Sequence, residues 1–310
     1  MRTEYSVNSA LRKPKRLGRK KLNDCYWGYL MILPVMVGLI AFYIIPFFKT
    51  FFISFTNMGA FGAYNSINLD NFKKILTDTT FYLALKNTLV FTIIAVPVGV
   101  FLSILLAVLL NSNIKGLTVY RTIYFLPAVT MPAAVSMVWK WLFNSNYGLI
   151  NFLLSKVGIK GPGWITDPKI ALFSIIMVAI WTKVGYNMII LLAGLQGISK
   201  SYYEAAEIDG AGGLAKFFKI TLPLLTPTIF FVVVMTLIES FQVFDYIFMM
   251  ISTNSVALES TQSVVYLFYR SAFELQEKGY ASAIAIVLFF IIMIITAVQV
   301  KLQNKWVNYE

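Results

Sequence analysis

The chain has 310 residues, of which 58% are hydrophobic and 13% are charged, and it carries a net charge of +12. A soluble domain cannot bury that much apolar surface, so the composition indicates an integral membrane protein. The single cysteine, Cys25, and the lack of histidine exclude a disulfide within the chain and argue against a Cys/His metal site. We therefore expect no bound metal.

Long apolar stretches predict an all-α, polytopic membrane protein with six transmembrane helices. Each stretch approaches the ~20 residues that cross a hydrocarbon core of ~30 Å, where a helix satisfies its own backbone hydrogen bonds. The predicted spans are residues 25–48, 87–112, 122–141, 170–197, 221–250 and 279–300. They form one transmembrane domain, 25–301, between an N-terminal tail, 1–24, and a C-terminal tail, 302–310. Kinks are expected at Pro34, Pro97, Pro127 and Pro132.

The N-terminal tail is strongly basic, which predicts a cytoplasmic N-terminus. Its positive residues are Arg2, Arg12, Lys13, Lys15, Arg16, Arg19, Lys20 and Lys21. Six crossings would return the C-terminus to the cytoplasm as well. A nucleic-acid-binding arm is the alternative interpretation of these charges. Next to a membrane span, an orientation signal against anionic lipid is favoured, so membrane lipid rather than nucleic acid is the expected partner.

The loop between the fourth and fifth spans, residues 198–222, has the pattern of a short capped helix. Ser201 and Glu204 have the spacing of a capping box, which predicts a helix that starts near Tyr202. Asp209-Gly210 predicts its end, because glycine tolerates the left-handed conformation found there. A second short helix is expected at about 214–220. Read by itself, this could be an ordinary interfacial loop in which Glu204 only caps the helix.

The run from Glu204 to Pro223, EAAEIDGAGGLAKFFKITLP, resembles the signature loop of the membrane subunits of binding-protein-dependent ABC importers. Other stretches are similar to the carbohydrate branch of that family, the maltose and glycerol-3-phosphate permease group. These stretches are residues 30–55, 69–72, 86–88, 120–127, 192–196, 244–245 and 279–283. One departure is Thr253-Asn-Ser-Val, where the family usually has a Gly-Gly-Pro run.

The resemblance implies that the loop is a coupling helix that docks in a cleft of a cytoplasmic ATPase. The docking residues would be Glu204, Ala205, Ala206, Asp209 and Gly210. It further implies a second homologous permease subunit, two ATPase subunits, an extracytoplasmic sugar-binding protein and a bacterial or archaeal plasma membrane.

ATP and magnesium are expected on the ATPase, with no cofactor on this chain. Gly210-Ala-Gly-Gly lacks the Gly-Lys-Ser/Thr ending of a phosphate-binding loop, so this chain is not expected to be an enzyme.

Charged residues within spans are costly and often mark a path for solutes. Lys183, Glu239 and Asp245 are such residues, and the resemblance places substrate contacts in stretches 179–188 and 239–246. The candidate path residues are Thr182, Lys183, Tyr186, Asn187, Glu239, Phe241, Gln242 and Asp245. The alternatives are that Lys183 simply pairs with one of the two acids, or that only the second permease touches the cargo.

An oligosaccharide is the expected cargo, with glycerol-3-phosphate or another polyol as the alternative. One lysine against two acids within the spans favours a neutral sugar over an anion. An ion-coupled secondary transporter is an alternative from another class of membrane protein, but such transporters usually contain internal repeats, and none is visible in this sequence. A membrane enzyme would need a catalytic constellation that the sequence does not offer.

Overall fold

The computed structural model describes residues 19–112 and 115–308, with side chains from residue 26 onward. Most of the predicted N-terminal tail, residues 1–18, therefore lies outside the described residues. The chain divides into two compact units, Met1–Phe52 and Ile53–Glu310, each described here by itself.

The first unit contains one long bent helix. It consists of α1 (Arg19–Leu39), the π-helical turn η1 (Ile40–Ile44) and α2 (Ile45–Ile53). Its apolar stretch Tyr26–Ile53 has 28 residues, enough to cross a membrane. The π-turn lies just before Pro46, which has no amide to continue the regular hydrogen-bond ladder.

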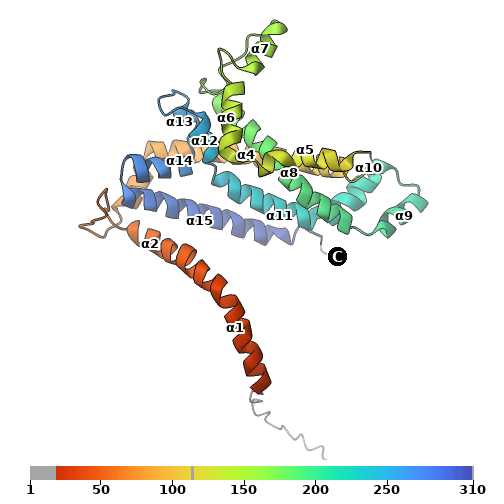
Figure 1. Ribbon diagram of the computed structural model, residues 1–310, viewed down its shortest axis with the longest axis horizontal. Coiled ribbons are helices and arrows are strands. Elements are labelled where there is room, and N and C mark those ends of the chain that lie inside the picture. Colours follow the sequence, from red (N-terminus) through yellow and green to blue (C-terminus); the bar gives the residue numbers. More distant parts are fainter. Residues whose placement is uncertain (1–18, 113–114, 309–310) are drawn as a thin grey trace, which may run out of the picture. The chain divides into compact units, whose positions relative to one another are not determined.

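The second unit is built on four long helices that run side by side (Figure 1). These are α4 (Thr79–Leu109), α8 (Ala171–Gly197), α11 (Leu222–Phe241) and α15 (Lys278–Gln303). α8 lies against α4, α5 (Leu117–Val129) and α11 and is the most buried of the candidate spans. Its buried residues occur all around the helix, as expected for the central helix of a bundle.

The predicted third span is bent rather than straight. α5 (Leu117–Val129) and α6 (Pro132–Leu142) meet at an angle of 97°. With 13 residues, α5 is about 20 Å long, which is shorter than a hydrocarbon core. Pro132 disfavours helical geometry at the preceding residue, and Thr130 and Met131 are extended or turned. The proline expected to kink the helix therefore breaks it.

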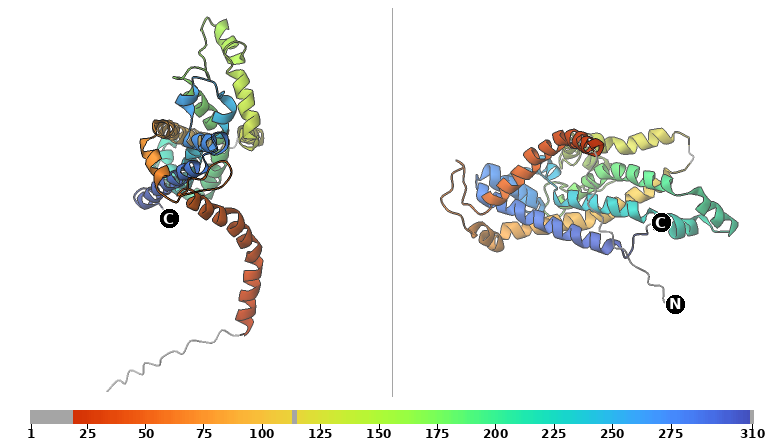
Figure 2. Two further views of the ribbon diagram at one scale, coloured as in Figure 1. Left: turned by 90° about the vertical axis from the view of Figure 1, so that its left-hand side faces the viewer. Right: turned by 90° about the horizontal axis from the view of Figure 1, so that it is seen from below.

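Beyond α6, α7 (Leu149–Lys156) and the loop to α8 form an arm that rests on aromatic side chains. Trp139 contacts both Phe143 and Trp181, and Phe143 stacks on Trp164. These contacts fix the base of the arm to the loop before α8 and to the first half of α8. Figure 2 shows α6 and α7 projecting away from the four long helices.

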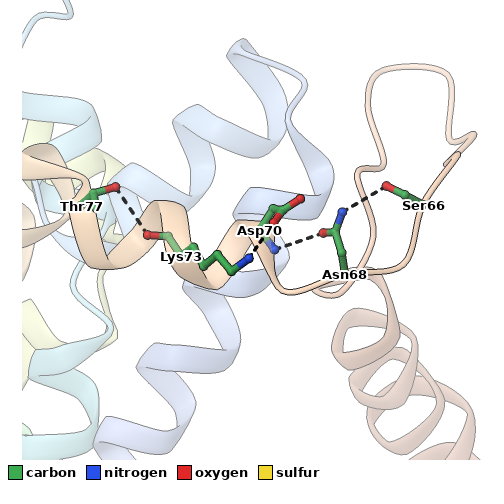
Figure 3. Close-up of polar contacts among 5 residues, drawn as sticks. All are labelled: Ser66, Asn68, Asp70, Lys73 and Thr77. Carbon is green, nitrogen blue, oxygen red and sulfur yellow. Dashed lines mark hydrogen bonds and ion pairs between the residues drawn. The ribbon is translucent and has the colours of Figure 1, made fainter.

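At the opposite end of the bundle from α9 (Lys200–Ile208), a chain of polar contacts leads into the short helix α3 (Asp70–Thr77) (Figure 3). The Asn68 side chain donates to Ser66 and accepts from the Asp70 amide. Asp70 pairs with Lys73 at 3.4 Å, and the Thr77 hydroxyl donates to the Lys73 carbonyl. The Asn68 and Asp70 contacts order the first turn of α3, and the Thr77 contact lies at its end.

α3 and the loop before it are attached to the start of α15. The Asn71 amide group donates to the carbonyls of Ser54 and Thr56, and the Gly279 amide donates to Met58. A Cβ on residue 279 would collide with the Thr56 carbonyl oxygen, so this close approach requires glycine.

Short elements complete the unit between α11 and α15: α12 (Asp245–Met250), α13 (Leu258–Thr261), α14 (Val264–Tyr269) and the π-turn η3 (Arg270–Glu274). Within the described residues, the only β-type pairing is the isolated bridge Thr56–Ile67. Among all the described residues of both units, five helices are long and apolar enough to cross a membrane, or six if α5 and α6 form one span. The predicted all-α, polytopic membrane fold is confirmed.

Candidate functional site: the α9 loop and the central cavity

The loop between α8 and α11 forms a short helix, α9, followed by α10 (Gly213–Lys216) and the π-turn η2 (Phe217–Thr221). The predicted start and cap of α9 were wrong by about two residues. Ser199 is the N-cap, and its hydroxyl accepts from the Ser201 amide at 3.4 Å. Ser201 lies within the first turn, and its hydroxyl is 2.8 Å from that of Ser199. Glu204 is therefore not needed as a capping residue.

The end of α9 is the one expected. Gly210 has φ of +74°, the left-handed conformation that favours glycine. The Ala211 amide donates to the Ala206 carbonyl and the Gly210 amide donates to Glu207, which is the pattern of a Schellman motif. The motif fixes the direction in which the chain leaves α9.

Two side-chain contacts join α9 to the segment that follows it. The Tyr203 hydroxyl lies 3.1 Å from that of Thr221 on η2. Glu207 pairs with Lys216 of α10 at 2.8 Å. The hydrogen bond and the charge of Lys216 hold the pKa of Glu207 below its ordinary value. α9 and the start of α11 are thus linked by more than the loop between them.

The outer surface of α9 is free for a partner within the described structure. Glu204 and Ala205 are exposed, Ala206 is half-buried, and Asp209 and Gly210 are exposed. Two apolar side chains that the sequence analysis did not select also stand out, because Ile208 is 88% exposed and Leu214 is 77% exposed. A short helix with an exposed apolar tip is suited to a groove on another protein.

Residues of α4, α8, α11 and α12, together with Pro132 and the link between α11 and α12, line a partly open cavity of about 260 Å³ in the second unit. Five of the eight candidate path residues line it: Lys183, Asn187, Glu239, Gln242 and Asp245. Lys183 and Asn187 come from α8, Glu239 from α11, and Gln242 and Asp245 from the segment that follows α11, so the tertiary structure brings together the two separate stretches selected in the sequence.

A charged and hydrogen-bonded wall lies on one side of this cavity. Lys183 and Glu239 form an ion pair of 2.7 Å between α8 and α11, and both side chains are about two-fifths exposed. The Asn187 amide donates to the Thr236 hydroxyl at 3.1 Å. Within the described part of the chain, Asp245 has no cation within ion-pair distance. Lys183 thus pairs with an acid, as one interpretation expected, and also lines the cavity, while its contact with a solute stays a prediction.

Three candidate residues are not part of the cavity lining. Phe241 is 1% exposed and packs in a separate core cluster with Val264 and Tyr280. Thr182 is buried and donates to the Val178 carbonyl of its own helix. Tyr186 is 47% exposed and lies outside the lining.

Other lining residues were missed. The aromatic ones are Phe91, Phe244 and Tyr246. Phe244 and Tyr246 lie inside the stretch 239–246, so their position next to Asp245 was a usable signal. Phe91 is in the middle of an apolar span, and nothing in its local sequence separates it from a core residue.

This cavity combines amide and charged groups with aromatic side chains, the mixture typical of sites for small polar solutes. Among the described residues, no group of three or more His, Cys, Asp or Glu side chains could hold a metal ion. The arrangement is suited to contacting a solute as it passes.

Comparison with known proteins places the chain in a family. The model for the binding-protein-dependent transport system inner membrane component matches residues 84–308. The chain is 38% identical to "Probable ABC transporter permease protein YesP" of Bacillus subtilis, over 91% of this chain and 92% of that protein. It is 36% identical to "Multiple sugar-binding transport system permease protein MsmF" of Streptococcus mutans, over 93% and 98%.

The fold is also that of a solved transporter chain. A chain in the crystal structure of a bacterial alginate ABC transporter, in complex with an alginate pentasaccharide-bound periplasmic protein, superposes with a TM-score of 0.84. The two chains share 23% identity, and the match covers 94% of this chain and 98% of that one. The family model and the two relatives above 30% identity show that this chain is a multi-pass membrane protein of the family of binding-protein-dependent transport system inner membrane components.

Proposed function

We propose that this chain is a permease subunit of an ABC importer that carries an oligosaccharide across the plasma membrane. ATP and magnesium bind to two separate ATPase subunits, and a second homologous permease completes the membrane path. An extracytoplasmic sugar-binding protein delivers the cargo. The N- and C-termini and α9 lie on the cytoplasmic side, in agreement with the basic N-terminal tail.

The observation that carries this proposal is the geometry of α9. It is a well-capped helix with an exposed outer face, joined by Tyr203 and Glu207 to the segment that leads into α11. In our proposal the ATPase holds α9 in a surface groove. Closure of the ATPase dimer then moves α9, and α11 moves with it as a rigid element.

The cavity supports a neutral cargo. Glu239 neutralises Lys183, and Asp245 leaves one negative charge without a partner among the described residues. An anion such as glycerol-3-phosphate would meet net repulsion there, whereas a neutral sugar can use Asn187 and Gln242 as hydrogen-bonding groups and Phe244 or Tyr246 as an apolar face. The relative named as a multiple sugar-binding transport system permease supports a sugar as the cargo, while relatives named as sn-glycerol-3-phosphate permeases keep that anion as the alternative.

The first experiment is co-purification of the permease pair with the ATPase in detergent. We expect the native chain to retain the ATPase and Glu204→Lys to lose it, while both still bind the second permease and elute as folded complexes. A folded Glu204→Lys complex with the native amount of ATPase would contradict the docking role of α9. Uptake by liposomes that contain the complete transporter then compares labelled neutral oligosaccharides with labelled glycerol-3-phosphate. ATP-dependent uptake of glycerol-3-phosphate alone would contradict the neutral cargo.

A further inference from the structure

The segment after α15 folds back onto the first turns of α11. Val307 is only 7% exposed, and the Trp306 ring lies edge-on to Phe230 with 5.8 Å between ring centres. The Asn308 amide donates to the Thr226 hydroxyl at 2.9 Å. Figure 1 shows the segment that follows α15 beside the end of α11 that is nearest to α10. This C-terminal segment, residues 304–308, thus joins the last helix of the bundle to the helix that follows α9.

The contact is made where α11 lacks a regular hydrogen bond. Pro227 has no amide, so the Pro223 carbonyl four residues earlier loses its usual donor. The Thr226 hydroxyl donates to that carbonyl at 2.6 Å. Having used its only hydrogen there, the hydroxyl can still accept, and it accepts from Asn308. The Thr226 hydroxyl therefore supplies a donor to the carbonyl that Pro227 leaves without one, and it also accepts a hydrogen bond from the C-terminal segment.

The same junction is held from the side of α9. Just before α11, η2 departs from regular α-helical bonding, and Pro223 and Pro227 follow within ten residues of its start. Such a stretch is prone to bend. Tyr203 contacts Thr221 at one side of it, and Asn308 and Trp306 contact Thr226 and Phe230 at the other. This stretch is therefore held by side-chain contacts at both of its ends.

We propose that the C-terminal segment 304–308 positions the start of α11, with Thr226 as the positioning residue, so that α9, α11 and α15 move as one body. Without this brace, a force applied at α9 bends the junction at Pro223 and Pro227 and does not reach α15. This inference rests on the proposed docking of α9 to an ATPase. It adds the route by which the motion reaches the last helix of the bundle.

The test uses the complete transporter in lipid nanodiscs and needs no cargo. Spin labels are placed at Lys219→Cys on η2 and Val298→Cys on α15, both exposed positions, in a Cys25→Ser background. The distance between the labels is measured without nucleotide and after trapping with ATP and vanadate. We expect an unchanged distance in the otherwise native chain. In Thr226→Val, which keeps the side-chain shape and removes the hydroxyl, we expect a shifted or broadened distance after trapping.

Basal ATP hydrolysis provides the second readout. If the junction bends, the ATPase can close without moving the membrane helices, and ATP hydrolysis is no longer slowed by them. We therefore expect Thr226→Val and Trp306→Ala to raise basal hydrolysis roughly 2- to 30-fold, which is the range of mutational effects on coupling. Thr122→Val is the matched control, since that exposed hydroxyl bonds only to Thr118 of its own helix. It should behave as native in both readouts.

The outcomes separate this inference from the proposed function. A native transporter that never holds an ATPase would overturn both. If the native transporter holds the ATPase but its label distance changes on trapping, the brace is wrong while the docking role stands. Native behaviour of Thr226→Val in both readouts would also overturn the brace alone.

Discussion

Lys183 and Glu239 join the two helices that flank α9 through an ion pair of 2.7 Å. One residue lies on α8 and the other on α11, and both line the central cavity. α8 leads into the α9 loop and α11 leads out of it, and the pair ties the middle of α8 to the last turn of α11. It also removes the only lysine charge of the cavity lining from use by a cargo.

The ion pair predicts that each single substitution costs more stability than expected from its share of the double substitution. Lys183→Met or Glu239→Gln leaves one partly buried partner unpaired, whereas the double variant removes both. We expect each single variant to lose stability between the ~1 kcal/mol of exposed pairs and the ~3–5 kcal/mol of buried ones, because both side chains keep solvent contact. The double variant should recover part of the loss. Thermal unfolding of all four proteins in detergent measures this, and additive losses would contradict the coupling.

Close packing of α5 on α8 depends on Gly185. A Cβ at this position would overlap the carbonyl oxygen of Tyr124, which is backbone and cannot swing aside. We expect Gly185→Ala to separate the helices and to cost on the order of 1–3 kcal/mol, the usual cost of overpacking. The loss appears as a lower unfolding temperature or a lower folded yield.

Gly197 gives the matched control for that change. It is the last residue of the same helix, and a Cβ there would have no atom within 4 Å. Gly197→Ala should be neutral or slightly stabilising, since alanine favours helix by up to ~1 kcal/mol over glycine. Equal destabilisation by the two substitutions would mean that the contact with Tyr124 is not the cause.

The left-handed conformation of Gly210 predicts a difference between two substitutions at one position. Asparagine tolerates φ near +74°, whereas a β-branched valine is a strong outlier there. A Cβ at 210 would meet no neighbour, so space is not the issue. We expect Gly210→Asn to keep ATPase binding and Gly210→Val to weaken it by about tenfold, through ~1–2 kcal/mol of backbone strain. Titration of the ATPase onto the purified permease pair compares them, and equal binding would argue against a fixed end to α9.

Asp78 predicts a pH dependence at the start of α4. Burial raises its pKa, but hydrogen bonds from the Tyr280 hydroxyl and the Thr80 amide outweigh that effect and hold the pKa below its ordinary value. A lowered pKa in the folded state means that the ionised carboxylate stabilises the fold above the ordinary pKa of aspartate. That contribution is lost as the pH falls through the lowered value.

Asp78→Asn should therefore be less stable than native near neutral pH, and the difference should shrink in acid. Tryptophan fluorescence during thermal unfolding, measured across a pH series in detergent, gives both curves. A constant difference at every pH would show that the charge of Asp78 is not what matters. Asp70→Asn serves as the control, because its ion pair with Lys73 is largely exposed and worth little.

Much of the fold could be predicted from the sequence because membrane insertion is governed by local composition. Predictions for 170–197 and 279–300 differ from the ends of α8 and α15 by at most three residues. Where a helix extends beyond the membrane-crossing stretch, its ends were predicted less accurately. α4 begins eight residues before the predicted start, since its first two turns pack beside α3 and carry polar residues.

The candidate site shows the same division. The end of α9 at Gly210 was predictable because it depends on the local backbone preference of one glycine. Its beginning was not, because Ser199 and Ser201 are both acceptable caps and the choice between them depends on how α8 ends. The two stretches around Lys183 and Glu239 were selected separately, and only the packing of α8 on α11 makes them one wall of a cavity.

By itself, the sequence determined the class of the protein, an all-α membrane chain with a capped loop helix between two spans, because hydrophobicity and backbone preference act over a few residues. The tertiary structure alone decided the exclusion of Phe241 from the cavity and the return of the C-terminal segment to Thr226. Each of these depends on contacts between residues far apart in the chain, and no local preference encodes which distant partner fills a given space.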